Sequence, residues 1–311
     1  MSVLVVKSGG AAGFEEWRAC FAEMAPALDV RFWDEMGDPA EVDFALVWDP
    51  EPGRLAAMGR LRCIFGAGAG VDLIVRDPDF PRQVPLVRMT PAGAAQRMGE
   101  YVCWAALHLV RQGRRMALAQ ARGAWDYFDC ASAAGTRAGI MGLGVMGTRA
   151  AAMLQGLGFA VHGWSRGEKR LPGVRDFVGD AALDGFLAET DLLICLLPDT
   201  PETRGILARP LFEKLPRGAM LINAGRGAQQ DLDAVLAALA EGRLAGAVLD
   251  VFEPEPLAEG HPAWAAENLT ITPHVASLPP RRERAAWVAH CIAGIEAGRW
   301  PEKIYNPDLG Y

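Results

Sequence analysis

The stretch from Thr136 to Arg166 constrains the fold most, because it combines an apolar strand, a glycine-rich turn, a helix and a second strand. The first strand, Ala138 to Met141, leads into Gly142, Gly144 and Gly147 with the spacing GxGxxG. Such glycines permit a tight turn, close approach of the backbone to a pyrophosphate, and close packing of helix on strand. The helix then directs its free N–H groups and positive dipole end at the phosphates. This context favours a dinucleotide site over a merely structural turn.

The end of the second strand, Phe159 to Trp164, indicates which dinucleotide is bound. An NAD site carries an acidic residue about 20 positions after the turn, which binds the ribose 2′-hydroxyl. This chain instead has Ser165, followed by Arg166, Lys169 and Arg170. A carboxylate would repel a 2′-phosphate, whereas a hydroxyl beside a guanidinium would bind one. The pattern favours NADPH over NADH, with a solvated basic turn as the alternative.

Size and composition exclude several other classes of protein. A chain of 311 residues, 51% of them hydrophobic, is long enough for two domains with substantial cores. Its longest apolar runs, such as Leu192 to Leu197, are far shorter than the roughly 18 residues that a membrane-spanning helix needs. The first residues, MSVLVVKSGG, lack the pattern of a signal peptide and are typical of the first strand of a cytoplasmic protein.

The net charge and the cysteines argue against several kinds of binding partner and structural site in this chain. The net charge of −7 predicts no general attraction to nucleic acid or to anionic membranes, so an anionic substrate must be bound by local donors. The six cysteines form no CxxC pair, and several lie in apolar runs. Reduced, buried thiols are therefore expected rather than a disulfide framework or a metal site.

The first part of the chain alternates short apolar strands with helical patterns, which predicts a parallel sheet covered by helices. After the strand at Cys63 to Phe65 comes the small-residue run Gly66 to Asp72. The backbone N–H groups of Ala69 and Gly70 could approach an anion such as a carboxylate, although a flexible turn is equally compatible. Trp48, also at a strand end, could wall a small pocket or lie in the core.

The second part repeats the alternation of strands and helices. We expect one long helix from Ala94 to Ala121, and a helix from Pro280 to Ala297 with an exposed arginine face. Asp231 is a plausible N-cap. Between these helices, strands lead into segments suited to the cofactor site, namely Leu197, Pro198, Thr203, Ala224 and Gly225, in addition to Val145 and Met146 of the glycine turn.

Three strand-end residues, Arg226, Glu255 and His274, carry the chemistry that a ketone reduction requires. Hydride transfer from a nicotinamide leaves negative charge on the carbonyl oxygen, which needs a proton and a fixed cation. An imidazole can donate a proton near neutrality, and a neighbouring carboxylate favours its charged form. The planar guanidinium can bind carboxylate and carbonyl oxygens together. Each residue alone could be structural, but their positions after successive strands favour a joint catalytic role.

The chain also resembles the D-2-hydroxyacid dehydrogenases. The matching segments, in order, are Asn223 to Gly227, Leu249 to Pro256 and Thr272 to His274, with 29 residues from Arg226 to Glu255 and 19 from Glu255 to His274. Further segments look like the glyoxylate/hydroxypyruvate reductase A branch, namely Phe65 to Asp72, Trp164 to Arg166, Leu196 to Thr203, Thr272 to Ala276 and Gly310-Tyr311. The chain departs from the broader family at Ala276, where glycine is usual, and at Val145, where a polar residue is common.

The resemblance implies roles for individual residues. Arg226 would hold substrate and polarise its carbonyl, His274 would act as acid and base with Glu255 as its partner, and Asp250 would lie near the nicotinamide amide. The backbone of Ala69 and Gly70 would bind the substrate carboxylate. The resemblance also implies a homodimer.

We therefore expect two doubly wound α/β lobes, with a Rossmann cofactor domain at residues 98–282 inserted into a flavodoxin-like substrate domain at 1–97 and 283–311. The expected reaction is NADPH-dependent reduction of glyoxylate or hydroxypyruvate to the 2-hydroxy acid. The alternatives are a dehydrogenase for a bulkier 2-oxo acid and a non-catalytic nucleotide-sensing protein on the same scaffold.

Overall fold

The computed structural model describes residues 1–89 and 93–307, and the chain divides into two compact units. One unit contains Met1–Ala92 and Pro279–Tyr311, and the other contains Gly93–Leu278. The sequence suggested boundaries at 97/98 and 282/283, a few residues further along the chain. The Gly310-Tyr311 pair lies outside the described residues.

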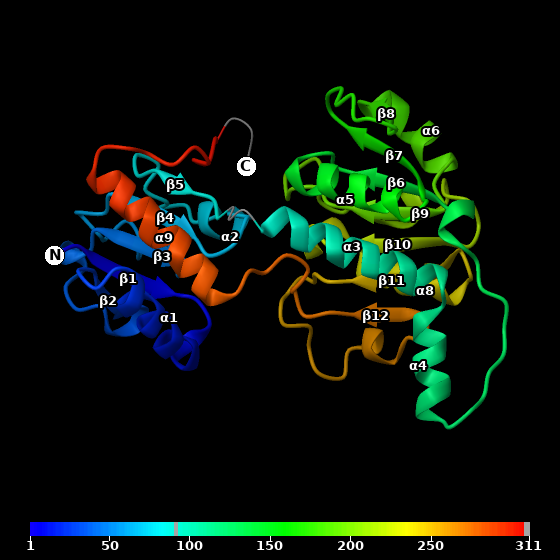
Figure 1. Ribbon diagram of the computed structural model, residues 1–311, viewed down its shortest axis with the longest axis horizontal. Coiled ribbons are helices and arrows are strands. Elements are labelled where there is room, and N and C mark those ends of the chain that lie inside the picture. Colours follow the sequence, from blue (N-terminus) through cyan, green and yellow to red (C-terminus); the bar gives the residue numbers. More distant parts are fainter. Residues whose placement is uncertain (90–92, 308–311) are drawn as a thin grey trace. The chain divides into compact units, whose positions relative to one another are not determined.

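The first unit is built on a parallel sheet of five strands in the order β2-β1-β3-β4-β5, as expected for a flavodoxin-like lobe (Figure 1). Val3 and Val5 of β1 pack into one hydrophobic cluster, and Leu4 and Val6 pack into another. Both faces of the sheet are therefore buried, as is usual for parallel sheets. The strands are β1 (Val3–Lys7), β2 (Asp29–Phe32), β3 (Phe44–Val47), β4 (Cys63–Gly66) and β5 (Leu86–Val87).

Helices α1 (Gly10–Met24) and α9 (Arg281–Glu296) cover one face of this sheet, and the short α2 (Asp72–Val75) packs on the other. The expectation of an exposed arginine face on α9 is wrong for Arg284, which is only 6% exposed and lies over the ring of Trp17. The helix packs closely on α1, so Arg284 faces inward at their contact. Beyond α9, the chain pairs antiparallel with β5 through Val87 and Ile304, so this part of the segment after α9 lies beside the sheet of the first unit.

The second unit has a parallel sheet of seven strands in the order β12-β11-β10-β9-β6-β7-β8. The chain builds outward from β6 in one direction and then continues from β9 in the other, which confirms the doubly wound Rossmann arrangement. In such sheets ligands bind outside the carboxyl ends of the strands, near this reversal. The strands are β6 (Arg137–Met141), β7 (Ala160–Ser165), β8 (Arg175–Val178), β9 (Leu192–Cys195), β10 (Ala219–Asn223), β11 (Leu244–Leu249) and β12 (Leu269–Ile271).

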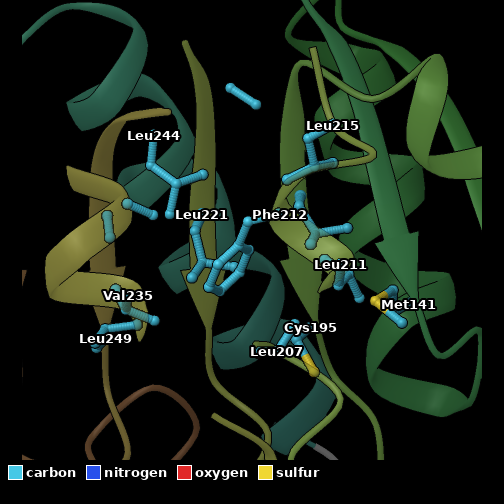
Figure 2. Packing of buried hydrophobic residues seen from close by; sticks show 14 of the residues in the cluster. Met141, Cys195, Leu207, Leu211, Phe212, Leu215, Leu221, Val235, Leu244 and Leu249 are labelled. Atoms are coloured by element: carbon cyan, nitrogen blue, oxygen red, sulfur yellow. The ribbon is translucent and has the colours of Figure 1, made fainter. Parts of the chain in front are cut away.

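Helices cover both faces of this sheet. Buried residues of α3 (Ala94–Val110) and α5 (Val145–Gly156) pack on one face. Residues of α6 (Leu183–Ala188), α7 (Arg209–Phe212) and α8 (Leu232–Ala240) pack on the other, where Figure 2 shows Phe212 beside Leu221 of β10. In the described parts of the chain, no helix has both the length and the apolar character needed to cross a bilayer.

Two local expectations differ from the structure. The predicted single helix from Ala94 to Ala121 is two helices, α3 and α4 (Gly113–Ala121), because Gln112 adopts a left-handed conformation with φ 54°. Gly113 suits this break, since a Cβ there would lie 2.3 Å from the ring of His108. Strand β8 was not predicted, because its sequence RDFV contains no apolar run.

Candidate active site

The three glycines of the turn after β6 differ in whether the protein's own packing requires glycine at that position. Gly142 has φ 100°, and a Cβ there would lie 2.9 Å from the carbonyl oxygen of Leu196. A Cβ on Gly147 would lie 2.0 Å from the oxygen of Gly142. Both positions therefore need glycine for the packing of the protein itself.

Gly144 is different, because it has φ −75° and a Cβ on it would meet no heavy atom within 4 Å. The fold would accept a side chain here, so this glycine leaves open space beside the amino end of α5, whose first N–H groups have no side-chain cap. Open space next to uncapped backbone donors fits a dinucleotide pyrophosphate. The residues present thus match the cofactor that the motif predicts.

At the end of β7, the turn from Ser165 to Arg170 is shaped by its own backbone contacts. The Ser165 hydroxyl donates to the Gly167 carbonyl (2.8 Å). The Asp176 carboxylate accepts from the N–H groups of Lys169 (2.6 Å) and Arg170 (3.0 Å). This acidic group therefore binds backbone amides in the turn, and the side chains of Arg166, Lys169 and Arg170 are exposed.

In the loop after β10, both the backbone N–H and the backbone carbonyl of Arg226 form hydrogen bonds with side chains. Its N–H donates to Oε1 of Gln229 (2.9 Å), and its carbonyl accepts from Nδ2 of Asn223 (3.1 Å). Both partners are fully buried. The guanidinium in turn donates to the Gly225 carbonyl (2.8 Å). A side chain at the end of a buried strand is thus presented from a rigid loop.

Gln229 also connects this loop to the one after β9. Its Nε2 donates to the carbonyls of Leu197 (2.7 Å) and Pro198 (3.0 Å), and Thr203 Oγ1 donates to the same Pro198 oxygen (2.7 Å). A Cβ on Gly225 would lie 2.4 Å from Oε1 of Gln229, so only glycine fits beside it. The expected cofactor residues of these two loops therefore form one hydrogen-bonded unit. Gln229, two residues after the Asn223 to Gly227 motif, was not among the predicted site residues, because its role depends on contacts with the loop after β9.

The loop after β11 meets the Arg226 loop. A Cβ on Gly227 would lie 2.0 Å from the carbonyl carbon of Phe252, so the two backbones touch. This contact brings Glu255 toward Arg226, whose positive charge acts on the Glu255 carboxyl.

Glu255 and His274 form a direct pair, with Oε2 of the carboxylate 2.7 Å from Nδ1 of the imidazole. The other carboxylate oxygen accepts from the N–H of Phe252 (2.9 Å). Burial acts to raise the pKa of Glu255, but the hydrogen bonds from His274 and Phe252 and the charges of His274 and Arg226 bring this pKa below its ordinary value. Glu255 is therefore ionised at neutral pH and keeps the imidazole in a fixed orientation.

His274 owes its position to Asp250, which is 1% exposed at the end of β11. The Asp250 carboxylate accepts from Oγ1 of Thr272 (2.6 Å) and from the N–H groups of Val275 (2.9 Å) and Ala276 (2.9 Å). These bonds hold the turn in which His274 has the left-handed φ of 54°. Tyr101 of α3 extends the network, because its hydroxyl lies 2.7 Å from Oγ1 of Thr272.

The first unit holds the remaining predicted residues, Trp48 after β3 and Ala69 and Gly70 after β4. A Cβ on Gly68 would lie 2.7 Å from the Trp48 ring, so the ring lies against the loop backbone. Arg88 Nε donates to the carbonyl of Ala69 (3.1 Å). The structure thus gathers Arg226, Glu255 and His274 in the second unit, and Trp48, Ala69 and Gly70 in the first.

Of the other histidines in the described parts of the chain, His162 is buried and bonded to Thr190 (2.8 Å), and His108 is bonded to Thr270 (2.9 Å). Both therefore have structural contacts. All six cysteines are free thiols, of which Cys63, Cys103, Cys195 and Cys291 are buried and Cys20 and Cys130 are partly exposed.

A Rossmann sheet with an open phosphate turn, followed by strand-end loops that carry an arginine and a carboxylate–histidine pair, defines a nicotinamide-dependent dehydrogenase. Residues 103–276 match the model of the D-isomer specific 2-hydroxyacid dehydrogenase NAD-binding domain. The chain therefore belongs to the D-isomer specific 2-hydroxyacid dehydrogenase family and is an NAD(P)-dependent enzyme of that family.

Whole-chain relatives agree with this assignment. The chain is 41% identical over 302 residues to glyoxylate/hydroxypyruvate reductase A of Serratia proteamaculans, with 96% of each chain covered. A D-isomer specific 2-hydroxyacid dehydrogenase from Xanthobacter autotrophicus, solved with NADPH and MES, shares 41% identity and a TM-score of 0.89, with 100% of this chain and 99% of that chain covered. An NADPH-dependent glyoxylate/hydroxypyruvate reductase from Sinorhizobium meliloti, solved with NADP and sulfate, shares 37% identity and a TM-score of 0.90, with 100% of both chains covered.

Proposed function

We propose that the protein reduces a small 2-oxo acid, glyoxylate or hydroxypyruvate, to its 2-hydroxy acid with NADPH. The observation that carries this proposal is the Glu255–His274 pair at 2.7 Å, on loops beside the rigidly held Arg226. This combination supplies a proton and a fixed positive charge to a carbonyl oxygen. The names of the relatives from Serratia and Sinorhizobium support the same substrate class.

NADPH would be held by the turn from Gly142 to Gly147, including Val145 and Met146, and when bound it supplies the hydride. The loops after β9 and β10 would line its site with Leu197, Pro198, Thr203, Ala224 and Gly225. Gln229 joins the two loops by donating to the carbonyls of Leu197 and Pro198. Asp250 would lie near the nicotinamide amide while its carboxylate orders the His274 turn.

The substrate would be bound by charge and by hydrogen bonds. Arg226 would hold the substrate and polarise its keto oxygen through the planar guanidinium. Because Nδ1 of His274 faces Glu255, its Nε2 would be the nitrogen that gives the proton. In the first unit, the amides of Ala69 and Gly70 would bind the carboxylate, and Trp48 would limit the size of the substrate.

Steady-state assays of NADPH oxidation with glyoxylate, hydroxypyruvate and bulkier 2-oxo acids test the proposed reaction. We expect turnover of the two small acids, and a loss of kcat/KM of at least about 100-fold in Arg226→Ala and His274→Ala, the scale of lost oxyanion stabilisation or acid catalysis. Unchanged kcat/KM in both variants would contradict the proposed roles. Cofactor binding without turnover of any 2-oxo acid would instead support a nucleotide-sensing protein.

The NADPH preference is supported by Ser165 at the end of β7 and by the exposed side chains of Arg166, Lys169 and Arg170 in the turn that follows, where Arg170 also pairs with Glu168 (2.8 Å). Fluorescence titration should give tighter binding of NADPH than of NADH, and Arg166→Asp should weaken NADPH at least about tenfold while changing NADH little. Equal affinities of the parent protein for the two cofactors would refute the preference.

We also propose a homodimer, supported by aromatic side chains on the segment after α4. Trp125 is 98% exposed and Tyr127 is 86% exposed. This segment is held in place, because Asp126 forms two hydrogen bonds with Arg115 (2.6 and 2.8 Å). Ordered, exposed aromatics are typical of protein interfaces. Light scattering should give a dimer mass, and a monomer at micromolar concentration would refute this proposal.

A further inference from the structure

We propose that Arg88 is a positioning residue that orients the amides of Ala69 and Gly70 for an anionic ligand, a role that rests on the proposed binding of a 2-oxo acid carboxylate there. Arg88 follows β5, and its Nε donates to the carbonyl of Ala69 (3.1 Å). The N–H of the next residue, Met89, donates to the carbonyl of Gly68 (3.3 Å). Two consecutive carbonyls of the loop are thus held by two consecutive residues after β5.

The direction of these carbonyls determines the direction of the amides. In a trans peptide, the carbonyl of one residue and the N–H of the next point in opposite directions. The Gly68 carbonyl points toward Met89, so the N–H of Ala69 points away from it. The Ala69 carbonyl points toward the Arg88 side chain, so the N–H of Gly70 also points away. Both N–H groups therefore emerge on the side of the loop opposite to Arg88 and Met89.

Two adjacent N–H groups on one side of a loop make an anion-binding concavity. In the described ranges, 1–89 and 93–307, neither amide donates to a protein group. The small side chains of Ala69 and Gly70 leave room for a ligand. This is the geometry that a carboxylate with two acceptor oxygens requires.

The backbone of Arg88 is itself fixed by a hydrogen bond, so its side chain can hold the loop in one orientation. Its backbone N–H donates to the carbonyl of Lys303 (2.9 Å), beside the antiparallel contact of Val87 with Ile304. The start of the loop is fixed as well, because the N–H of Ala67 donates to the carbonyl of Val47 (2.8 Å). The carbonyls of Gly68 and Ala69 lie between this fixed start and Asp72, and they accept from Met89 and Arg88 respectively.

Arg284 supports the same loop from α9. Its Nη1 lies 3.4 Å from the carbonyl oxygen of Ala67, and its guanidinium is buried over the Trp17 ring. Burial, followed by the charge of Arg281, lowers the pKa of Arg284 to about 10, so it stays positively charged at neutral pH. Arg88 and Arg284 therefore both place positive charge next to the loop, which favours an anion there.

The test uses Arg88→Met, which removes the donor and keeps the length, and Arg88→Gln, which is polar but too short to reach. The matched control is Arg82→Met, because Arg82 is an exposed arginine on the connection that precedes β5. The readouts are kcat and KM for glyoxylate, the inhibition constant of oxamate as a carboxylate probe, the Kd of NADPH and the melting temperature. Arg88→Lys serves as the conservative rescue variant.

For both Arg88 variants we expect KM and the oxamate inhibition constant to rise about tenfold or more, with kcat and the NADPH Kd within about twofold of the parent values. Arg88→Lys should recover part of the loss, and Arg82→Met should behave as the parent. A folded Arg88→Gln or Arg88→Met protein with parental KM and oxamate inhibition overturns the proposal. Failure of both variants to fold also overturns it, because the role would then be purely structural. Absence of 2-oxo acid turnover in the parent protein refutes the proposed function instead, and is recognised before any variant is compared.

Discussion

Replacing Asp250 by asparagine tests whether a single buried carboxylate holds the proposed proton donor in place. The substitution keeps the size of the side chain but replaces one carboxylate oxygen by an NH₂ group. In the parent protein Oδ1 accepts from Thr272 and Val275, and Oδ2 accepts from the N–H of Ala276 at 2.9 Å. In the variant, an NH₂ group faces the Ala276 N–H, so one buried donor loses its acceptor.

The cost can be worked out from these contacts. An unsatisfied buried N–H costs roughly 1–3 kcal/mol, and the two remaining bonds lose the charge that makes such bonds about twice as strong as neutral ones. With a loss of about 1 kcal/mol for each of these two bonds, the sum is about 3–5 kcal/mol. For a unit the size of residues 93–278, each kcal/mol corresponds to roughly 2–4 °C, so the melting temperature should fall by about 6–20 °C.

Activity should fall more steeply than stability. The turn that Asp250 holds carries His274, and a displacement of a catalytic group by about 1 Å can cost on the order of 100-fold in rate. We therefore expect kcat/KM for glyoxylate to drop at least about 100-fold at a temperature where the variant is fully folded. Differential scanning calorimetry and steady-state kinetics provide the two measurements.

Asp231→Asn is the matched control, because Asp231 is an exposed helix N-cap whose Oδ1 accepts from the N–H of Ala234 (3.0 Å). Asparagine caps helices as well as aspartate does, so this variant should melt within about 1 °C of the parent protein. An Asp250→Asn protein with melting within about 2 °C of the parent and kcat/KM within about threefold would refute the reasoning.

Two further predictions concern the cofactor turn and the effect of pH. Gly147→Ala should destabilise the second unit, because its Cβ would lie 2.0 Å from the Gly142 oxygen. Gly144→Ala should keep the parental melting temperature but weaken NADPH binding at least about tenfold in a fluorescence titration. Parental NADPH affinity in Gly144→Ala would contradict the assignment of this space to the cofactor. Burial acts to raise the pKa of Glu255, but the hydrogen bond from His274 helps to lower this pKa below 4.5. The ionised Glu255 therefore stabilises the folded protein above pH 4.5, and this stabilisation is lost as the pH falls through the lowered pKa. Melting curves should therefore show the largest difference between parent and Glu255→Gln near neutral pH and a shrinking one in acid, and a difference that grows in acid would count against this ionisation.

The sequence by itself determined the class of fold and the ends of strands that carry the chemistry. Buried parallel strands are continuous apolar runs, as in Leu192 to Cys195, and a loop residue directly after such a run lies at the carboxyl edge of the sheet. Arg226 and His274 could therefore be selected from local pattern alone. The same local rules failed where no apolar run exists, as at β8, and where one left-handed residue, Gln112, divides a helical pattern.

Only the tertiary structure decided how these residues are held. No local pattern in the sequence marks Gln229 or Arg88, and their roles follow from hydrogen bonds to residues distant along the chain, Leu197 for Gln229 and Ala69 for Arg88. Likewise, the pattern GxGxxG does not distinguish its three glycines. The packing shows that Gly147 has no room for a Cβ, whereas Gly144 has open space beside it that a ligand could fill. The physical reason is that strand and helix patterns arise from neighbouring residues, while the direction of a hydrogen bond or the space around a Cβ depends on segments that meet only after folding.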